Sequence, residues 1–218
     1  MIFNGEMVRA ILDGRKTQTR RIMKVQPKPS KSRPGDFWFS SKKLESMVHV
    51  SDLVPGNSPI SDCHLFFQEH CCPFGTVGDR IWVRETWAEA GAGAPDVKLY
   101  RANYPEHVTT HYENVPPADE IRWTPSIHMP RCASRLTLEI TGVRVERLAS
   151  ISDDDAGKEG YPANPEPYGG DMDKWLWFRQ LWDSIYPDQS FKHNPWVWVI
   201  EFKVVPNVPV NSTGSDLR

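Results

Sequence analysis

The chain has 218 residues and a formal net charge of −2. This length can build one well-buried core or a compact domain with large insertions, and we expect the second. A nearly neutral chain has no overall attraction to nucleic acid, so any polyanion must bind to a local cationic patch. No apolar run approaches the ~18 residues of a membrane span, which favours a soluble cytoplasmic protein without a membrane partner.

The densest group of reactive side chains lies in residues 14–21, an octet with four cations and two hydroxyls. Upstream, the apolar spacing of Glu6–Asp13 predicts a short helix, and Gly14 stands where a left-handed C-terminal cap belongs. A strand that begins after this cap would present two hydroxyls and a guanidinium on one face, which is the candidate site. Alternatively, a cationic run at a helix end is an ordinary solvated surface that complements the helix dipole.

Residues 26–59 are polar and interrupted by prolines, which predicts an insertion or long loop outside the core. Their strong apolar cluster, Phe37-Trp38-Phe39, could anchor the loop or stack on a base. Anchoring is the favoured interpretation, because exposed aromatic triplets are costly without a partner. We place the two large insertions at about 26–75 and 91–131.

The cysteines do not have the spacing of a disulfide framework. Cys71 and Cys72 are adjacent, and reduced thiols are expected in a chain of this size. The nearby Cys63, His64 and His70 suggest zinc, but zinc ligands usually come as regularly spaced pairs, and this group has no second pair. We therefore expect neither a metal nor another cofactor.

Alternating residues predict the strands of a sheet. After a turn at Gly78-Asp79, Arg80–Trp87 alternates as a strand. Leu136–Leu148 is a longer strand whose apolar positions change parity at Thr141-Gly142, so a bulge or bend is expected there. Trp196–Val205 also alternates and closes the sheet.

Two helices are expected in the C-terminal half. Ser152 caps a short helix over residues 153–160, whose first turn is rich in acids, as the helix dipole favours. Asp171 caps a longer helix that ends at Tyr186 and carries tryptophans at helical spacing, which is typical of packing into a core. The polar tail at 206–218 is expected to be disordered.

The octet resembles the signature of the ASCH family, whose members are PUA-like small β-barrels linked to RNA and modified nucleosides. The signature Gly-x-Lys-Thr-x-Thr-x-Arg is matched by Gly14, Lys16, Thr17, Thr19 and Arg21. Further stretches match in the same order over about half the chain, at 77–85, 136–148, 153–160 and 199–203. The resemblance implies one α+β domain over residues 1–205, a PUA-like mixed β-barrel with flanking helices and long loop insertions.

The resemblance also implies a pocket for a modified nucleoside or RNA, and in the family's amidohydrolases a glutamate at the position of Glu159 completes a Lys/Thr/Glu set. Hydrolysis of an amide such as that of N4-acetylcytidine needs a nucleophile, a proton acceptor and a group that stabilises the oxyanion. Our hypothesis assigns Thr19 as the nucleophile or the group that positions water, Lys16 as the base, Glu159 as a proton shuttle and Arg21 as a binder of substrate or oxyanion. The pKa of Lys16 must then fall from about 10.4 toward neutrality, which burial and neighbouring cations favour. Because Lys16 and Thr19 are three residues apart, Lys16 must lie in the turn while Thr19 enters the strand.

Residues expected to bind substrate extend beyond this set and are Thr17, Arg20, Arg21, Trp82, Glu85, Arg131 and Arg135. The same positions also suit a non-catalytic module, in which cations and the tryptophans Trp82 and Trp123 bind a phosphate backbone and stack bases. A third hypothesis, a ribonuclease, would use Lys16 and Arg21 on the phosphate with Glu159 as base. The oligomeric state stays open.

Overall fold

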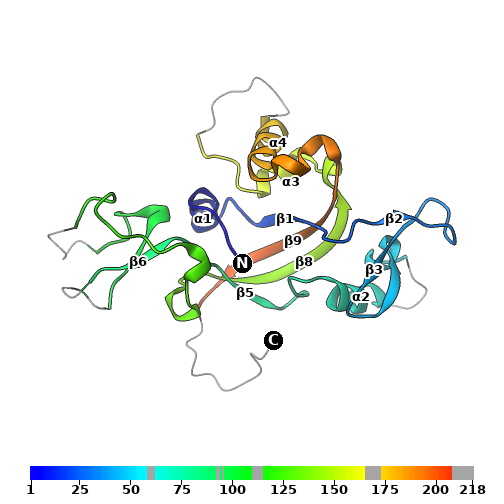
Figure 1. The fold of residues 1–218 in the computed structure, drawn as a ribbon, viewed down its shortest axis with the longest axis horizontal. Helices are drawn as coiled ribbons and strands as arrows, with labels where there is room; N and C mark the ends of the chain where they lie inside the picture. Colours follow the sequence, from blue (N-terminus) through cyan, green and yellow to red (C-terminus); the bar gives the residue numbers. More distant parts are fainter. Residues whose placement is uncertain (58–61, 92–93, 95, 110–114, 165–172, 208–218) are drawn as a thin grey trace, which may run out of the picture. The chain divides into compact units, whose positions relative to one another are not determined.

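The computed structural model describes residues 1–57, 62–91, 94, 96–109, 115–164 and 173–207. The chain is of the α+β class, with an antiparallel sheet that curls and few helices (Figure 1). It divides into two compact units. Unit 1 comprises Met1–Asp13, Arg80–Leu138 and Val204–Arg218, and unit 2 comprises Gly14–Asp79 and Glu139–Lys203. Among the described residues, no helix has both the length and the apolar character needed to cross a membrane.

Unit 2 is built on neighbouring strands. In the order in which they lie side by side, they are β1 (Gln18–Ile22), β9 (Trp196–Val205) and β8 (Thr137–Arg147) (Figure 1). The buried positions of β8 change parity between Ile140 and Val143, as the apolar pattern of the sequence predicts, and the bulge or bend expected at Thr141-Gly142 stays a prediction. The strand thereby keeps apolar side chains in the core on both sides of this point.

Helices α3 (Asp153–Lys158) and α4 (Asp173–Ile185) cover one face of this sheet. Ser152 caps α3 by accepting a hydrogen bond from the N–H of Asp155 at 3.1 Å, as predicted. α4 buries an aromatic stripe in a core that it shares with β9, which confirms the predicted core-facing helix. Its predicted N-cap, Asp171, lies outside the described residues.

The register of β1 against β9 decides which way the octet residues point. Arg20 lies opposite Val199, whose side chain belongs to the core cluster of α3 and α4. Arg20 and its alternate neighbour Gln18 therefore face the helical layer. Thr19 and Arg21 point to the opposite face of the sheet.

Residues 26–59, predicted to be an insertion or long loop, contain a second sheet, and a helix follows at 63–71. The sheet is antiparallel, and its strands and the following helix are β2 (Lys28–Pro29), β3 (Phe37–Ser41), β4 (Ser46–His49) and α2 (Cys63–Cys71). The long-loop alternative is wrong, and the insertion stays a prediction. The strands were missed because they are short and the surrounding prolines and lysines conceal their pattern. The aromatic cluster in β3 does anchor the segment as predicted, since the ring of Phe37 meets the ring of Trp196 edge-on with centroids 5.0 Å apart.

Unit 1 contains one longer helix and short strands, which are α1 (Gly5–Leu12), β5 (Arg80–Trp82), β6 (Trp87–Glu89) and β7 (Lys98–Tyr100). After α1, Gly14 has a φ of +74°, which confirms the predicted left-handed cap. The single strand predicted at 80–87 is instead two strands, and the residues between them include the buried Glu85. Short 3₁₀ helices connect the elements of the chain: η1 (Val50–Leu53), η2 (Arg101–Asn103), η3 (Ser126–His128), η4 (Arg131–Ala133), η5 (Leu148–Ser150), η6 (Pro187–Gln189) and η7 (Phe191–His193).

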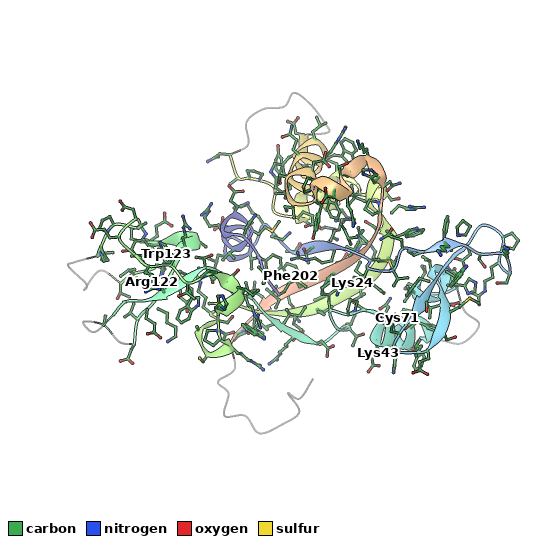
Figure 2. All side chains as sticks on the ribbon, viewed as in Figure 1. Lys24, Lys43, Cys71, Arg122, Trp123 and Phe202 are labelled. Carbon is green, nitrogen blue, oxygen red and sulfur yellow. The ribbon has the colours of Figure 1, made fainter. Side chains whose placement is uncertain are left out.

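The four cysteines are free thiols. Cys71 of α2 (Figure 2) donates to the hydroxyl of Ser41 at 3.6 Å, and burial raises its pKa. Burial also raises the pKa of Cys72 to about 11. Both thiols therefore stay protonated at neutral pH. In the part of the chain that the structure describes, no group of three or more His, Cys, Asp or Glu side chains is arranged to hold a metal ion.

Candidate functional site: a buried charge network beside strand β1

The centre of the site is a contact between the octet and the end of α3. Lys16 forms an isolated antiparallel bridge with Glu159, the C-cap residue of α3. The Lys16 Nζ donates to the backbone oxygen of Glu159 at 2.8 Å and to its Oε2 at 2.7 Å. These side chains are 0% and 4% exposed. The octet and Glu159, which lie 143 residues apart in the chain, therefore meet as a buried ion pair.

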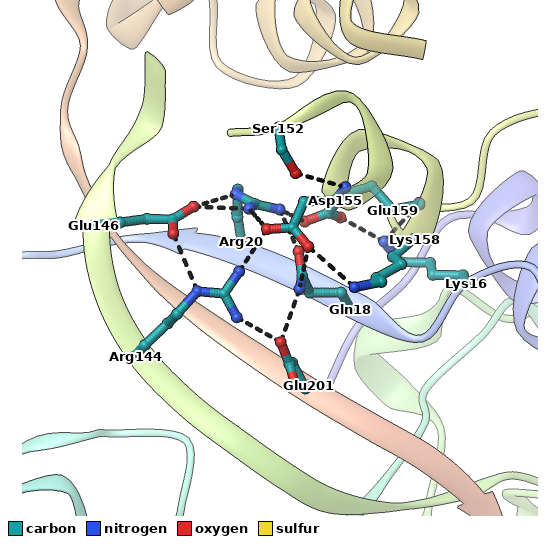
Figure 3. Close-up of polar contacts among 10 residues, drawn as sticks. All are labelled: Lys16, Gln18, Arg20, Arg144, Glu146, Ser152, Asp155, Lys158, Glu159 and Glu201. Carbon is teal, nitrogen blue, oxygen red and sulfur yellow. Dashed lines mark hydrogen bonds and ion pairs between the residues drawn. The ribbon is translucent and has the colours of Figure 1, made fainter. Parts of the chain in front are cut away.

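Arg20 joins the same carboxylate from the strand. Its Nη1 donates to Glu159 Oε1 at 3.1 Å and to Gln18 Oε1 at 2.5 Å. Its Nε and Nη2 both donate to Glu146 Oε1, at 3.1 and 2.7 Å, and Nη2 also reaches Asp155 Oδ2 at 3.3 Å (Figure 3). The Arg20 side chain is 0% exposed, so its guanidinium is fully committed to protein partners.

A more exposed shell surrounds this centre (Figure 3). Arg144 of β8 donates to Glu146 at 3.1 Å, to Asp155 at 2.7 Å and to Glu201 of β9. Lys158 pairs with Asp155 at 3.3 Å. The cations Lys16, Arg20, Arg144 and Lys158 thus face the carboxylates Glu146, Asp155, Glu159 and Glu201. Their formal charges cancel, so the network is not a cationic patch.

Burial changes the acid–base chemistry of the amine at the centre. Desolvation lowers the pKa of Lys16, and the nearby cations Arg21 and Arg20 act in the same direction. Glu159 opposes this shift by its charge and its hydrogen bond, but burial is the larger effect. A neutral Lys16 amine, which can accept a proton, is therefore reached at lower pH than for an ordinary lysine.

The carboxyl group of Asp155 shifts in the direction expected for a paired acid. Burial alone would raise its pKa, but the charges of Arg144 and Arg20 and the hydrogen bonds from Lys158 and Gln18 lower it overall. Asp155 is therefore ionised at neutral pH and helps to hold Arg20 in place.

The two threonines of the octet lie elsewhere, one on β1 and one just before it. Thr19 is buried on the opposite face of β1 from Arg20, and the exposed Thr17 makes backbone hydrogen bonds to Lys158 and Phe202. Arg15 donates to the backbone oxygens of residues 160 and 161, at 3.2 and 2.8 Å, and so ties down the segment that follows Glu159.

The other expected binding residues, Trp82, Glu85, Arg131 and Arg135, belong to unit 1. Arg135 grips both oxygens of the buried Glu85 at 2.9 Å each, and its guanidinium lies over the ring of Tyr100 at 4.1 Å. Trp82 lies under the guanidinium of Arg84 at 4.4 Å. Arg131 is exposed at the start of η4.

Unit 1 also contains an aromatic pair and a cavity. Trp123 (Figure 2), weighed as a base-stacking residue, donates to the backbone oxygen of Ala118 at 2.8 Å and meets the ring of Tyr104 edge-on. A cavity of about 590 Å³ is bordered by the first turn of α1, by Glu85 and by Arg101.

Sequence reasoning missed most of the partners of Arg20. Five residues that make hydrogen bonds in the network were not named as site residues: Gln18, Arg144, Glu146, Asp155 and Glu201. The available signal was the alternation of charged residues on β8 after its parity change, which places Arg144 and Glu146 on one face. Asp155 was explained by the helix dipole alone.

Comparison of the chain with protein-family models, with curated proteins and with solved structures returned no match.

Proposed function

We propose that this protein is an ASCH-like amidohydrolase, built on a PUA-like barrel, that removes the acetyl group from an N4-acetylcytidine-type nucleoside, free or within RNA. The observation that carries the proposal is the contact of 2.7 Å between the Lys16 amine and the Glu159 carboxylate. An amine with a lowered pKa beside a carboxylate is a suitable pair for general base catalysis.

The reaction follows from the chemistry of this pair. Neutral Lys16 takes a proton from water, and the oxygen attacks the acetyl carbonyl carbon to form a tetrahedral intermediate. Glu159 relays that proton to the N4 nitrogen, the carbon–nitrogen bond breaks, and cytidine leaves together with acetic acid, which then releases its proton to solvent. Water is the nucleophile in this proposal, because strand alternation turns Thr19 away from the face that carries Arg20.

Access to the pair depends on local movement. Because the two side chains are 0% and 4% exposed, a substrate carbonyl reaches them only when the residues that cover them are displaced. Arg15 holds the backbone immediately after Glu159, so its hydrogen bonds must lengthen or break when the site opens.

The test is an assay of purified protein with N4-acetylcytidine, followed by chromatography for cytidine. We expect turnover that disappears in Lys16→Ala. The matched control is Lys203→Ala, which removes an exposed lysine that pairs with Glu139 outside the network. Absence of turnover together with salt-sensitive retention of RNA would overturn the hydrolase in favour of the binding module.

A further inference from the structure

The carboxylate of Glu159 is shared between two cations of different chemistry. Its Oε2 accepts from the Lys16 amine at 2.7 Å, and its Oε1 accepts from Arg20 at 3.1 Å. We propose that Arg20 is a positioning residue, which holds Oε1 so that Oε2 stays directed at the Lys16 amine. The catalytic meaning of this role rests on the proposed function.

Arg20 is placed to position other groups and not to bind substrate. Its three guanidinium nitrogens donate to Gln18, Glu146, Asp155 and Glu159, and its side chain is 0% exposed. A substrate phosphate could reach this guanidinium only after several of these hydrogen bonds broke. Arg20 therefore acts through Glu159.

A fork of fixed geometry suits this role. Arginine presents planar donors that cannot be lost by deprotonation, so Arg20 keeps the same orientation and charge over the working pH range. The outer carboxylates Glu146 and Asp155 hold this fork from the side away from Glu159, and both are held in turn by Arg144. The shell thus fixes Arg20, and Arg20 fixes Glu159.

The charge of Arg20 also acts on the amine. The charged groups that act on Lys16 are Glu159, which favours the protonated form, and Arg21 and Arg20, which disfavour it. Removal of the Arg20 charge ends its repulsion of the protonated Lys16 amine. It also leaves Lys16 as the one of these two cations that still pairs with Glu159. Both changes favour the protonated amine, so the titration of Lys16 moves to higher pH.

The experiment compares Arg20→Gln, Arg20→Lys and Glu146→Gln with wild type. The control is Arg33→Gln, which removes an exposed arginine that pairs with Asp52 at 2.7 Å. The Lys16 amine is titrated by NMR in protein carrying ¹³C at the lysine ε-carbons, with its signal assigned by its loss in Lys16→Met. The pH profile of kcat/KM for N4-acetylcytidine is measured in parallel.

We expect Arg20→Gln to move the Lys16 titration to higher pH and to lower kcat/KM at neutral pH about tenfold or more, mainly through kcat. Arg20→Lys restores part of the effect because it keeps the charge without the fork. Glu146→Gln leaves the charge of Arg20 without one of its carboxylate partners, so it moves the Lys16 titration to lower pH, and it decides the question if Arg20→Gln does not fold. Arg33→Gln matches wild type.

The positioning role is overturned if the Lys16 titration is unchanged in both Arg20→Gln and Glu146→Gln. If Arg20→Gln does not fold, an unchanged titration in Glu146→Gln alone overturns it. The two readouts separate this inference from the proposed function, since the NMR titration does not need turnover. A shifted titration in a protein without turnover supports the positioning of Glu159 and rejects the hydrolase. If turnover depends on Lys16 but the Lys16 titration does not change in Arg20→Gln, the result supports the hydrolase and rejects the positioning role of Arg20.

Discussion

Among the described residues, two carboxylates are buried, one in each unit, and they are neutralised in different ways. Glu85 of unit 1 gives both oxygens to a single guanidinium, that of Arg135, at 2.9 Å each. Glu159 of unit 2 gives one oxygen to Arg20 and the other to the amine of Lys16. The burial of the two acids is similar, at 1% and 3% exposed, so burial alone does not distinguish them.

The difference lies in which partner can lose a proton. A guanidinium stays charged at any physiological pH, whereas a buried lysine amine can become neutral. The pair of Glu85 and Arg135 is therefore a fixed structural fork, and the group around Glu159 contains a proton donor and acceptor. Of the two buried acids, Glu159 is the one paired with a group that can lose a proton, and burial is the main cause that lowers the pKa of that group, Lys16.

The largest effect on turnover is expected when Glu159 is paired with arginine alone, as Glu85 is. Lys16→Arg keeps a cation beside Glu159 but removes the group that can be deprotonated. We expect N4-acetylcytidine turnover to fall by about 10²–10⁴-fold, measured as cytidine release. Lys203→Arg is the control, and comparable turnover in Lys16→Arg and wild type would exclude lysine as the base.

Neutralisation of each acid tests how much stability each arrangement carries. Glu159→Gln leaves two buried cations without their shared charge and should lower the free energy of unfolding by about 3–5 kcal/mol. Glu85→Gln should cost less, about 1–3 kcal/mol, because Arg135 is 18% exposed and remains over Tyr100. Urea unfolding of both variants gives these values, and equal losses would remove the distinction between the two sites.

The alkaline pH dependence of stability sharpens the comparison further. The pKa of Lys16 in the folded protein is below its ordinary value of 10.5. At a pH between the folded-state pKa and 10.5, the unfolded chain therefore binds more protons than the folded protein does. The free energy of unfolding should therefore rise with pH across this window, by up to about 1.4 kcal/mol per pH unit. Urea unfolding of wild type and Lys16→Met should show this rise in wild type alone. A parallel rise in the variant would assign it to another group.

A smaller effect is expected from the shell on the acid side. The folded-state pKa of Asp155 is lower than its ordinary value of 3.8, so its contribution is fully present above pH 3.8 and is lost as pH falls through the folded-state pKa. Asp155→Asn should reduce the free energy of unfolding at pH 7 by about 1 kcal/mol, since the side chain is partly hydrated. The deficit should shrink at pH values below 3.8, and a deficit that persists there unchanged would show that charge is not its cause.

The smallest effect is expected at the rim. Lys158 is 52% exposed and pairs with Asp155 three residues earlier in the chain. Lys158→Ala should change the free energy of unfolding by no more than about 0.5 kcal/mol, because exposed ion pairs contribute little. Thermal or urea unfolding can measure this change. A loss above about 1 kcal/mol would show that the exposed Lys158 is coupled to the buried centre of the network.

Local signals predicted much of the fold. The glycine after α1, the serine cap of α3 and the parity change in β8 depend on neighbouring residues, and each was found as predicted. The sheet at 26–75 was missed because its strands are too short to show alternation among prolines. Near Glu85, the strand pattern could not reveal that this buried carboxylate pairs with Arg135, 50 residues away.

The residues of the candidate site also divide into those that local sequence signals could identify and those that depend on distant partners. Lys16 and Glu159 could be named from motif and order, whereas the role of Arg20 depends on Glu146 and Asp155, which reach it from other elements. The spacing of charges along one strand does not reveal which distant carboxylate neutralises them. The register of β1 on β9, which only the fold supplies, decides that Arg20 faces α3 and that Thr19 does not.

The most direct test of this account is the titration of the Lys16 amine in the wild-type protein, followed by NMR of ¹³C-labelled lysine ε-carbons and assigned with Lys16→Met. The account predicts one lysine signal, absent from the variant, that titrates below the ordinary lysine pKa of 10.5. A Lys16 signal that titrates at or above 10.5 would mean that Glu159 holds the amine charged, and Lys16 could not then serve as the base.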